Sequence, residues 1–152
     1  MTIQQWLSEY AESHQHPTNK KVHFVCVPII FFTIVGFLYS VKLPMITCCN
    51  ITLAHIALLI VAIYYVKLSP PLSVGMILFS ILCLLGCGFL ESHLPIHLAL
   101  FCLIVFVLAW IGQFWGHGIE GKKPSFFKDL QFLMIGPAWI MTFIYNKIGI
   151  KI

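Results

Sequence analysis

The sequence predicts an all-α integral membrane protein: a bundle of about four transmembrane helices, preceded by an interfacial helix and followed by a re-entrant or interfacial segment. Of the 152 residues, 60% are hydrophobic and only 9% are charged, against about a quarter in soluble domains. Four apolar stretches also approach the roughly 20 residues that a membrane-spanning helix needs. With so few charges, a soluble globular protein, a disordered chain and a nucleic-acid-binding protein are excluded. The length suits one membrane domain over residues 1–152.

Residues 2–15 predict a short amphipathic helix at the start of the chain. Thr2 is a suitable N-cap. The apolar side chains that recur at helical spacing after it are Ile3, Trp6, Leu7 and Tyr10. A helix with one such face lies flat on a membrane surface, and we expect Pro17 to end it.

Four apolar segments follow, and each is predicted to cross the membrane. They cover approximately residues 22–40, 45–66, 72–90 and 95–115. Short polar or proline-bearing breaks at 41–44, 67–71 and 91–94 separate them and predict tight antiparallel hairpins.

A fifth apolar stretch, residues 126–145, is interrupted by Gly136-Pro137. A proline inside a helix removes a hydrogen bond and kinks or ends the helix. The stretch is therefore interpreted as a re-entrant or interfacial segment in preference to a broken spanning helix.

The lysines predict the orientation of the bundle. With four spans and both termini on one side, eight lysines fall on that side and only Lys42 on the other. Because cytoplasmic loops carry the excess of positive charge, both termini are predicted to face the cytoplasm. A fifth span would weaken the count to six against three, so the lysines favour four spans. A bacterial inner membrane and an endoplasmic reticulum membrane both fit.

The predicted topology brings four of the seven histidines to the cytoplasmic interface. They are His14, His16, His23 and His117. Gln113, His117 and Glu120 are four and three residues apart, so a continuing helix places them on one face. Neutral imidazoles are frequent ligands of iron and zinc, and a carboxylate can complete such a site. One cluster therefore consists of His14, His16 and His23, and the other of Gln113, His117 and Glu120. Together these two clusters indicate a metal site, although interfacial histidines also contact lipid headgroups.

The other three histidines are given different interpretations. His93 and His97, four residues apart near Glu91, form a rival metal pair, but they fall on the opposite side, where only Asn50 offers a further ligand. They are interpreted as interfacial residues. His55, near the middle of the second predicted span, is interpreted as a hydrogen-bonded packing residue.

The two polar clusters carry two motifs. The first consists of Tyr10, His14, Asn19, His23 and Pro28, and the second of Gln113, Gly116-His117-Gly118, Glu120, Lys122, Lys123 and Pro124. In both motifs the chain resembles the membrane-bound, iron(II)-dependent 2-hydroxy fatty acid dioxygenases of fatty acid α-oxidation. His16 stands where many relatives have asparagine, which leaves the number of ligands open.

The resemblance implies an activity and a role for each matching residue. The protein would use O₂ and Fe²⁺ to cleave a 2-hydroxy fatty acid to a fatty acid one carbon shorter, with the acyl chain lying between the spans within the membrane lipid. The implied iron ligands are His14, His23 and His117, with His16 or Glu120 as the next candidate. The residues implied to orient ligands or substrate are Asn19 and Gln113, and those implied to meet the substrate carboxylate are Lys122 and Lys123.

Three other functions compete with this one. A small transporter or channel would need a polar pathway, yet the predicted spans contain only His55 and a few hydroxyl residues. A non-catalytic membrane scaffold would require the two histidine clusters to lie apart. The di-metal membrane hydroxylases and desaturases use histidine boxes that only His93 and His97 match here.

Overall fold

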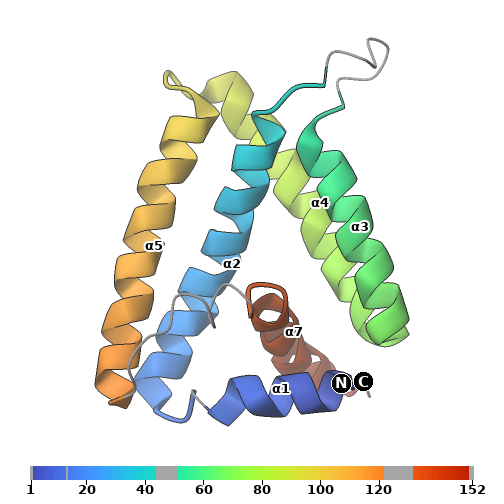
Figure 1. Ribbon diagram of the computed structural model, residues 1–152, viewed down its shortest axis with the longest axis vertical. Helices are drawn as coiled ribbons and strands as arrows, with labels where there is room; N and C mark the ends of the chain where they lie inside the picture. Colours follow the sequence, from blue (N-terminus) through green and yellow to red (C-terminus); the bar gives the residue numbers. More distant parts are fainter. Residues whose placement is uncertain (1, 13, 44–50, 122–131, 151–152) are drawn as a thin grey trace. The chain divides into compact units, whose positions relative to one another are not determined.

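The computed structural model describes residues 2–12, 14–43, 51–121 and 132–150, and the regular secondary structure in these ranges is helical apart from one isolated β-bridge (Figure 1). The helices are α1 (Ile3–Glu12), α2 (Pro17–Tyr39), α3 (Leu53–Leu68), α4 (Pro70–His93), α5 (Leu98–Glu120) and α7 (Ile135–Ile148). The predicted all-α class is confirmed. Helices α2, α4 and α5 are long and apolar enough to cross a membrane, and α3 is a shorter apolar helix.

Helix α1 confirms the predicted amphipathic segment and its cap. The Thr2 hydroxyl accepts the backbone N–H of Gln5 at 3.3 Å, and the Gln5 side-chain oxygen accepts the backbone N–H of Thr2 at 2.8 Å. This reciprocal pair satisfies two amides at the helix start. The prediction that Pro17 ends this helix was wrong, because α1 ends at Glu12 and Pro17 is the first residue of α2. Proline suits that position because the first helical residue needs no N–H donor.

Helices α3 and α4 form a hairpin and pack along each other (Figure 1). They meet at Ser69, which is the C-cap of α3 and the N-cap of α4. The predicted start of α3 at residue 45 was wrong. Thr52 is extended and pairs with Lys42 in an antiparallel bridge, so the helix begins at Leu53, while residues 44–50 lie outside the described ranges. Helix α4 continues to His93, and the next break therefore comes at 94–97.

The chain divides into two compact units. One consists of Met1–Phe31 and Val107–Ile152, and the other of Phe32–Phe106. Helices α2 and α5 contribute residues to both units. The predicted histidine clusters belong to the first unit, together with α1 and α7.

Within the first unit, α1 packs on α7 around a core that includes Tyr10, Val27 and Trp139. Pro137 lies in the first turn of α7, where proline is tolerated, so it does not interrupt the helix. At 14 residues α7 is shorter than the roughly 20 needed to cross a bilayer. This agrees with the predicted interfacial or re-entrant segment, although residues 126–131 lie outside the described ranges.

Candidate metal centre

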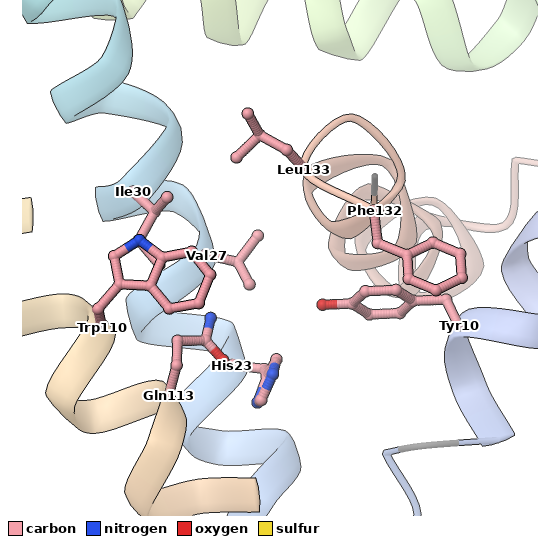
Figure 2. Close-up of a pocket in the computed structure, with 8 residues that line it drawn as sticks. All are labelled: Tyr10, His23, Val27, Ile30, Trp110, Gln113, Phe132 and Leu133. Atoms are coloured by element: carbon pink, nitrogen blue, oxygen red, sulfur yellow. The ribbon is translucent and has the colours of Figure 1, made fainter. Parts of the chain in front are cut away.

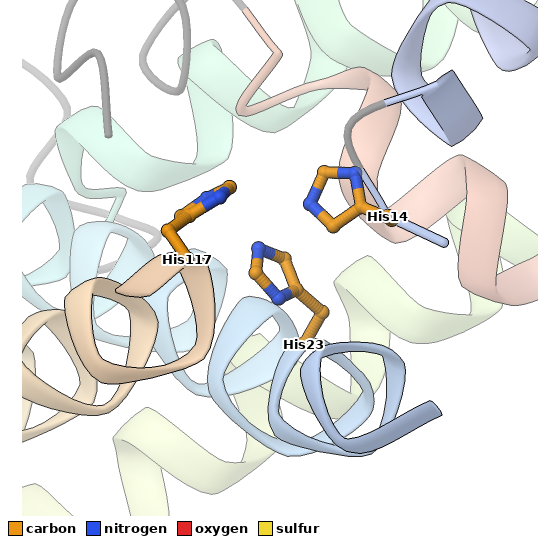
Figure 3. Close-up of side chains that lie close together, drawn as sticks. All are labelled: His14, His23 and His117. Atoms are coloured by element: carbon orange, nitrogen blue, oxygen red, sulfur yellow. The ribbon is translucent and has the colours of Figure 1, made fainter. Parts of the chain in front are cut away.

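Three buried histidines converge in the first unit (Figure 3). His14 follows α1, His23 lies in the second turn of α2, and His117 lies in the last turn of α5. Each offers one ring nitrogen, and these nitrogens all lie within 4.8 Å of one another. The ring centroids of His14 and His23 are 4.0 Å apart, and those of His23 and His117 are 4.9 Å apart. Histidines from the two clusters therefore lie together, as predicted. The scaffold hypothesis required the two clusters to lie apart, and this is not observed.

Backbone hydrogen bonds orient two of these rings. His14 Nδ1 donates to the Tyr10 carbonyl at 2.6 Å, and His23 Nδ1 donates to the Asn19 carbonyl at 3.0 Å. A carbonyl oxygen only accepts, so Nδ1 carries the proton and Nε2 of the neutral ring keeps its lone pair. Metal-ligating histidines are typically held in this way. Three imidazoles so arranged fit a first-row metal ion such as iron or zinc.

Aromatic side chains cover the His14 ring. The ring of Tyr10 stacks on it, with centroids 4.2 Å apart and planes at 15°. The centroid of the Trp139 ring lies 5.7 Å from that of His14 and 5.3 Å from that of Tyr10. A side chain of α7 therefore also helps to cover the His14 ring. Because Gly136 has no side chain, α7 comes close: a Cβ there would lie 3.0 Å from Val27 Cγ1 and 3.1 Å from the Tyr10 hydroxyl oxygen.

A carboxylate ties the two histidine-bearing segments together. Glu120 Oε1 accepts the backbone N–H of Gln15 at 2.8 Å, and Oε2 accepts the backbone N–H of His16 at 2.9 Å. Oε2 also accepts the side-chain amide N–H of Asn19 at 3.0 Å. We refer to these contacts among Gln15, His16, Asn19 and Glu120 as the Glu120 clasp. The clasp fixes the chain between His14 and α2 against the end of α5.

Gly116 lets α2 and α5 approach closely beside the clasp. A Cβ on Gly116 would lie 2.5 Å from Asn19 Oδ1 and 3.2 Å from Val22 Cγ1, whereas nothing lies within 4 Å of a Cβ on Gly118. Helix α5 ends at Glu120, and the next residue, Gly121, has a φ of 71°. Glycine is therefore needed at position 116 for the close packing of α2 and α5, and at position 121 for the positive φ after the helix.

A pocket lies beside the histidines (Figure 2). Its polar side chains are Tyr10, His23 and Gln113. The apolar residues that complete it are Val27, Ile30, Trp110, Phe132 and Leu133. In Figure 2 the amide of Gln113 points toward the His23 ring. The predicted helical face of Gln113, His117 and Glu120 therefore borders both the pocket and the histidine cluster.

The remaining predicted site residues are placed differently. His16 is exposed, and its Nδ1 accepts the backbone N–H of Thr18 at 3.2 Å, so it lies outside the cluster. Its role as a metal ligand stays a prediction. Lys122 and Lys123, the predicted contacts of a substrate carboxylate, lie outside the described residues.

The other three histidines belong to the second unit. Neither His93 nor His97 joins a group of three metal ligands among the described residues. The His93 ring stacks on Phe89, with centroids 4.2 Å apart. The prediction of a mid-span position for His55 was wrong, because it is the third residue of α3. It is hydrogen-bonded as predicted, since its Nδ1 accepts the backbone N–H of Thr52 at 3.1 Å.

Comparison with known proteins identifies the family. A family model described as "2-hydroxy-palmitic acid dioxygenase Mpo1-like" matches residues 1–148. The chain belongs to this family. It is also 28% identical over 151 residues to the 2-hydroxy-palmitic acid dioxygenase MPO1 of Saccharomyces cerevisiae, an alignment that covers 98% of this chain and 83% of the relative. No solved structure matches the chain.

The sequence reasoning overlooked two tryptophans at the centre. Trp110 could have been found, because it lies three residues before Gln113 and seven before His117, on the same face of α5. Trp139 carried no comparable signal, since its contact with His14 joins segments that are far apart in the chain.

Proposed function

We propose that this Mpo1-like protein is an iron(II)-dependent dioxygenase that shortens 2-hydroxy fatty acids by one carbon. The observation that carries the proposal is the convergence of His14, His23 and His117, three buried histidines whose ring nitrogens lie within 4.8 Å of one another. Iron(II) held by three imidazoles would keep open positions for O₂ and for the carboxylate and hydroxyl oxygens of the acid. The family and the name of the yeast relative support this choice of substrate.

The overall reaction balances without an added reductant. A 2-hydroxy acid and one O₂ become a fatty acid one carbon shorter, carbon dioxide and water. The C1–C2 bond breaks, C2 is oxidised from an alcohol to a carboxylic acid, and C1 leaves as carbon dioxide. The four electrons lost by the two carbons equal the four that reduce O₂.

The chain's own residues position the reactants and restrict water. The Tyr10 and Asn19 carbonyls hold the His14 and His23 rings with Nε2 available. The Glu120 clasp fixes the segment that carries His14, and we assign Glu120 and Asn19 this positioning role. The apolar part of the pocket offers an acyl chain a surface away from water. Lys122 or Lys123 would meet the carboxylate.

The test is product formation by the purified full-length chain. Loaded with iron(II) in air and given 2-hydroxyhexadecanoic acid, it should form pentadecanoic acid and consume one O₂ per product, with no reductant added. His117→Ala should lose both bound iron and product. His93→Ala is the matched control and should keep both. Equal product from wild type and His117→Ala would refute the site, and no product from iron-loaded wild type would refute the activity.

Metal analysis separates this proposal from a transporter. A transporter predicts uptake into proteoliposomes with no oxidation of lipid and no dependence on iron. Iron that copurifies with the chain and is lost in His23→Ala would favour the dioxygenase.

A further inference from the structure

The pocket beside the histidines contains a buried amide oxygen that accepts no hydrogen bond from any residue that the structure describes. Gln113 is only 5% exposed, and its Oε1 has no hydrogen-bond partner among the described residues. Buried polar groups are nearly always hydrogen-bonded, so an exception requires a reason. A buried hydrogen-bond acceptor of this kind in the wall of a pocket indicates a ligand that donates a hydrogen bond to it.

The rest of the pocket indicates what the ligand looks like. Gln113 and His23 form a polar side, whereas Val27, Ile30 and Trp110 offer apolar surface (Figure 2). A hydroxyl donor attached to an alkyl chain matches this division, and it should approach His23 from the side of the amide. A 2-hydroxy fatty acid has both: its hydroxyl group is on C2, and its alkyl chain begins at the adjacent carbon, C3.

We propose that Gln113 Oε1 accepts a hydrogen bond from the C2 hydroxyl of the bound acid, while the first methylenes lie along Val27 and Ile30. This inference rests on the proposed function and makes Gln113 the residue that distinguishes 2-hydroxy acids from unsubstituted fatty acids. A site built to pair with a hydroxyl rejects an analogue that lacks it, because the site's buried polar atom then stays unpaired.

Binding, measured apart from turnover, tests the assignment. The dissociation constants of 2-hydroxyhexadecanoic and hexadecanoic acid are obtained from thermal unfolding shifts of the full-length chain in one detergent, as purified and after iron loading without O₂. Gln113→Met keeps the length of the side chain but removes the acceptor. It should weaken binding of the hydroxy acid roughly tenfold and leave that of hexadecanoic acid unchanged. Ile30→Val, the control, should weaken both acids equally.

A second probe needs no variant. 2-Fluorohexadecanoic acid cannot donate a hydrogen bond, so the wild-type chain as purified should bind it as weakly as hexadecanoic acid. Binding as tight as that of the hydroxy acid would overturn the proposal.

Two further outcomes would also overturn the proposal. One is that Gln113→Met weakens the binding of both acids equally. The other is that the variant loses its bound iron, which would indicate that Gln113 Oε1 binds the metal and not the substrate hydroxyl. Failure of the dioxygenase proposal would look different. Product would be absent in air, while the binding ratios, measured without O₂, would still report on Gln113.

Discussion

Replacing Gly116 by alanine tests whether the Glu120 clasp assembles the histidine cluster. The added Cβ would lie 2.5 Å from Asn19 Oδ1, where ordinary contact begins at 3.4 Å. Asn19 must therefore move by about 1 Å, which takes its 3.0 Å hydrogen bond to Glu120 out of bonding range. Val22 Cγ1, which would lie 3.2 Å from the new methyl group, limits how far the backbone can absorb the change.

The size of the effect follows from two opposing contributions. Loss of a hydrogen bond to a charged group costs about 1.5–3 kcal/mol, and alanine's higher helix propensity returns up to about 1 kcal/mol. We expect Gly116→Ala to lower the free energy of unfolding by about 1–2 kcal/mol. Its iron affinity should fall roughly 10- to 100-fold, as is usual when the supports of metal ligands are removed.

Gly118→Ala is the matched control, because it lies two residues away on the same helix and its Cβ would meet nothing within 4 Å. It should keep wild-type iron affinity and gain up to about 1 kcal/mol of stability. Both variants are compared by unfolding in detergent and by competition with an iron chelator. If Gly116→Ala binds iron as tightly as Gly118→Ala, the close approach at Gly116 does not support the site and the reasoning is refuted.

Three further predictions follow from the site and the topology. Glu120→Gln keeps the shape of the side chain but loses one acceptor oxygen, so iron affinity should fall about tenfold; an unchanged affinity in chelator competition would remove the clasp from the site. Removing iron from the loaded chain should lower the melting temperature by about 5–10 °C if the metal was present at a hundred times its dissociation constant, and re-addition should restore it, whereas His117→Ala should show no such shift. Reporter domains fused to either terminus should both be active on the cytoplasmic side, and opposite locations of the two would contradict the lysine count.

The sequence predicted those parts of the site that depend on helical spacing. Gln113 and His117 are buried and Glu120 is half-buried on one helix, because α5 continues to Glu120 as the spacing required. Thr2 caps α1 because the pairing of Thr2 with Gln5 is local. Contacts within four residues of each other are set by helix geometry, so they can be inferred without knowing the rest of the fold.

Features that depend on distant partners were not predicted. The extended Thr52, which delays the start of α3, pairs with Lys42 across ten residues. Pro17 could end one helix or begin the next, and the structure has the second arrangement, in which Gln15 and His16 before it are hydrogen-bonded to Glu120. The sequence suggested Glu120 as a carboxylate that could complete a metal site, and the structure shows its oxygens hydrogen-bonded to Gln15, His16 and Asn19.

The separation of the clasped segments has a consequence for how the protein is made. The bond from Gln15 to Glu120 joins residues 105 positions apart. At some 5–20 residues per second, a ribosome needs about 5–20 s to add that length of chain. During this time the emerging polypeptide contains two of the three clustered histidines, His14 and His23. The third, His117, arrives with the end of α5, so the order of synthesis delays completion of the three-histidine cluster until α5 has been made.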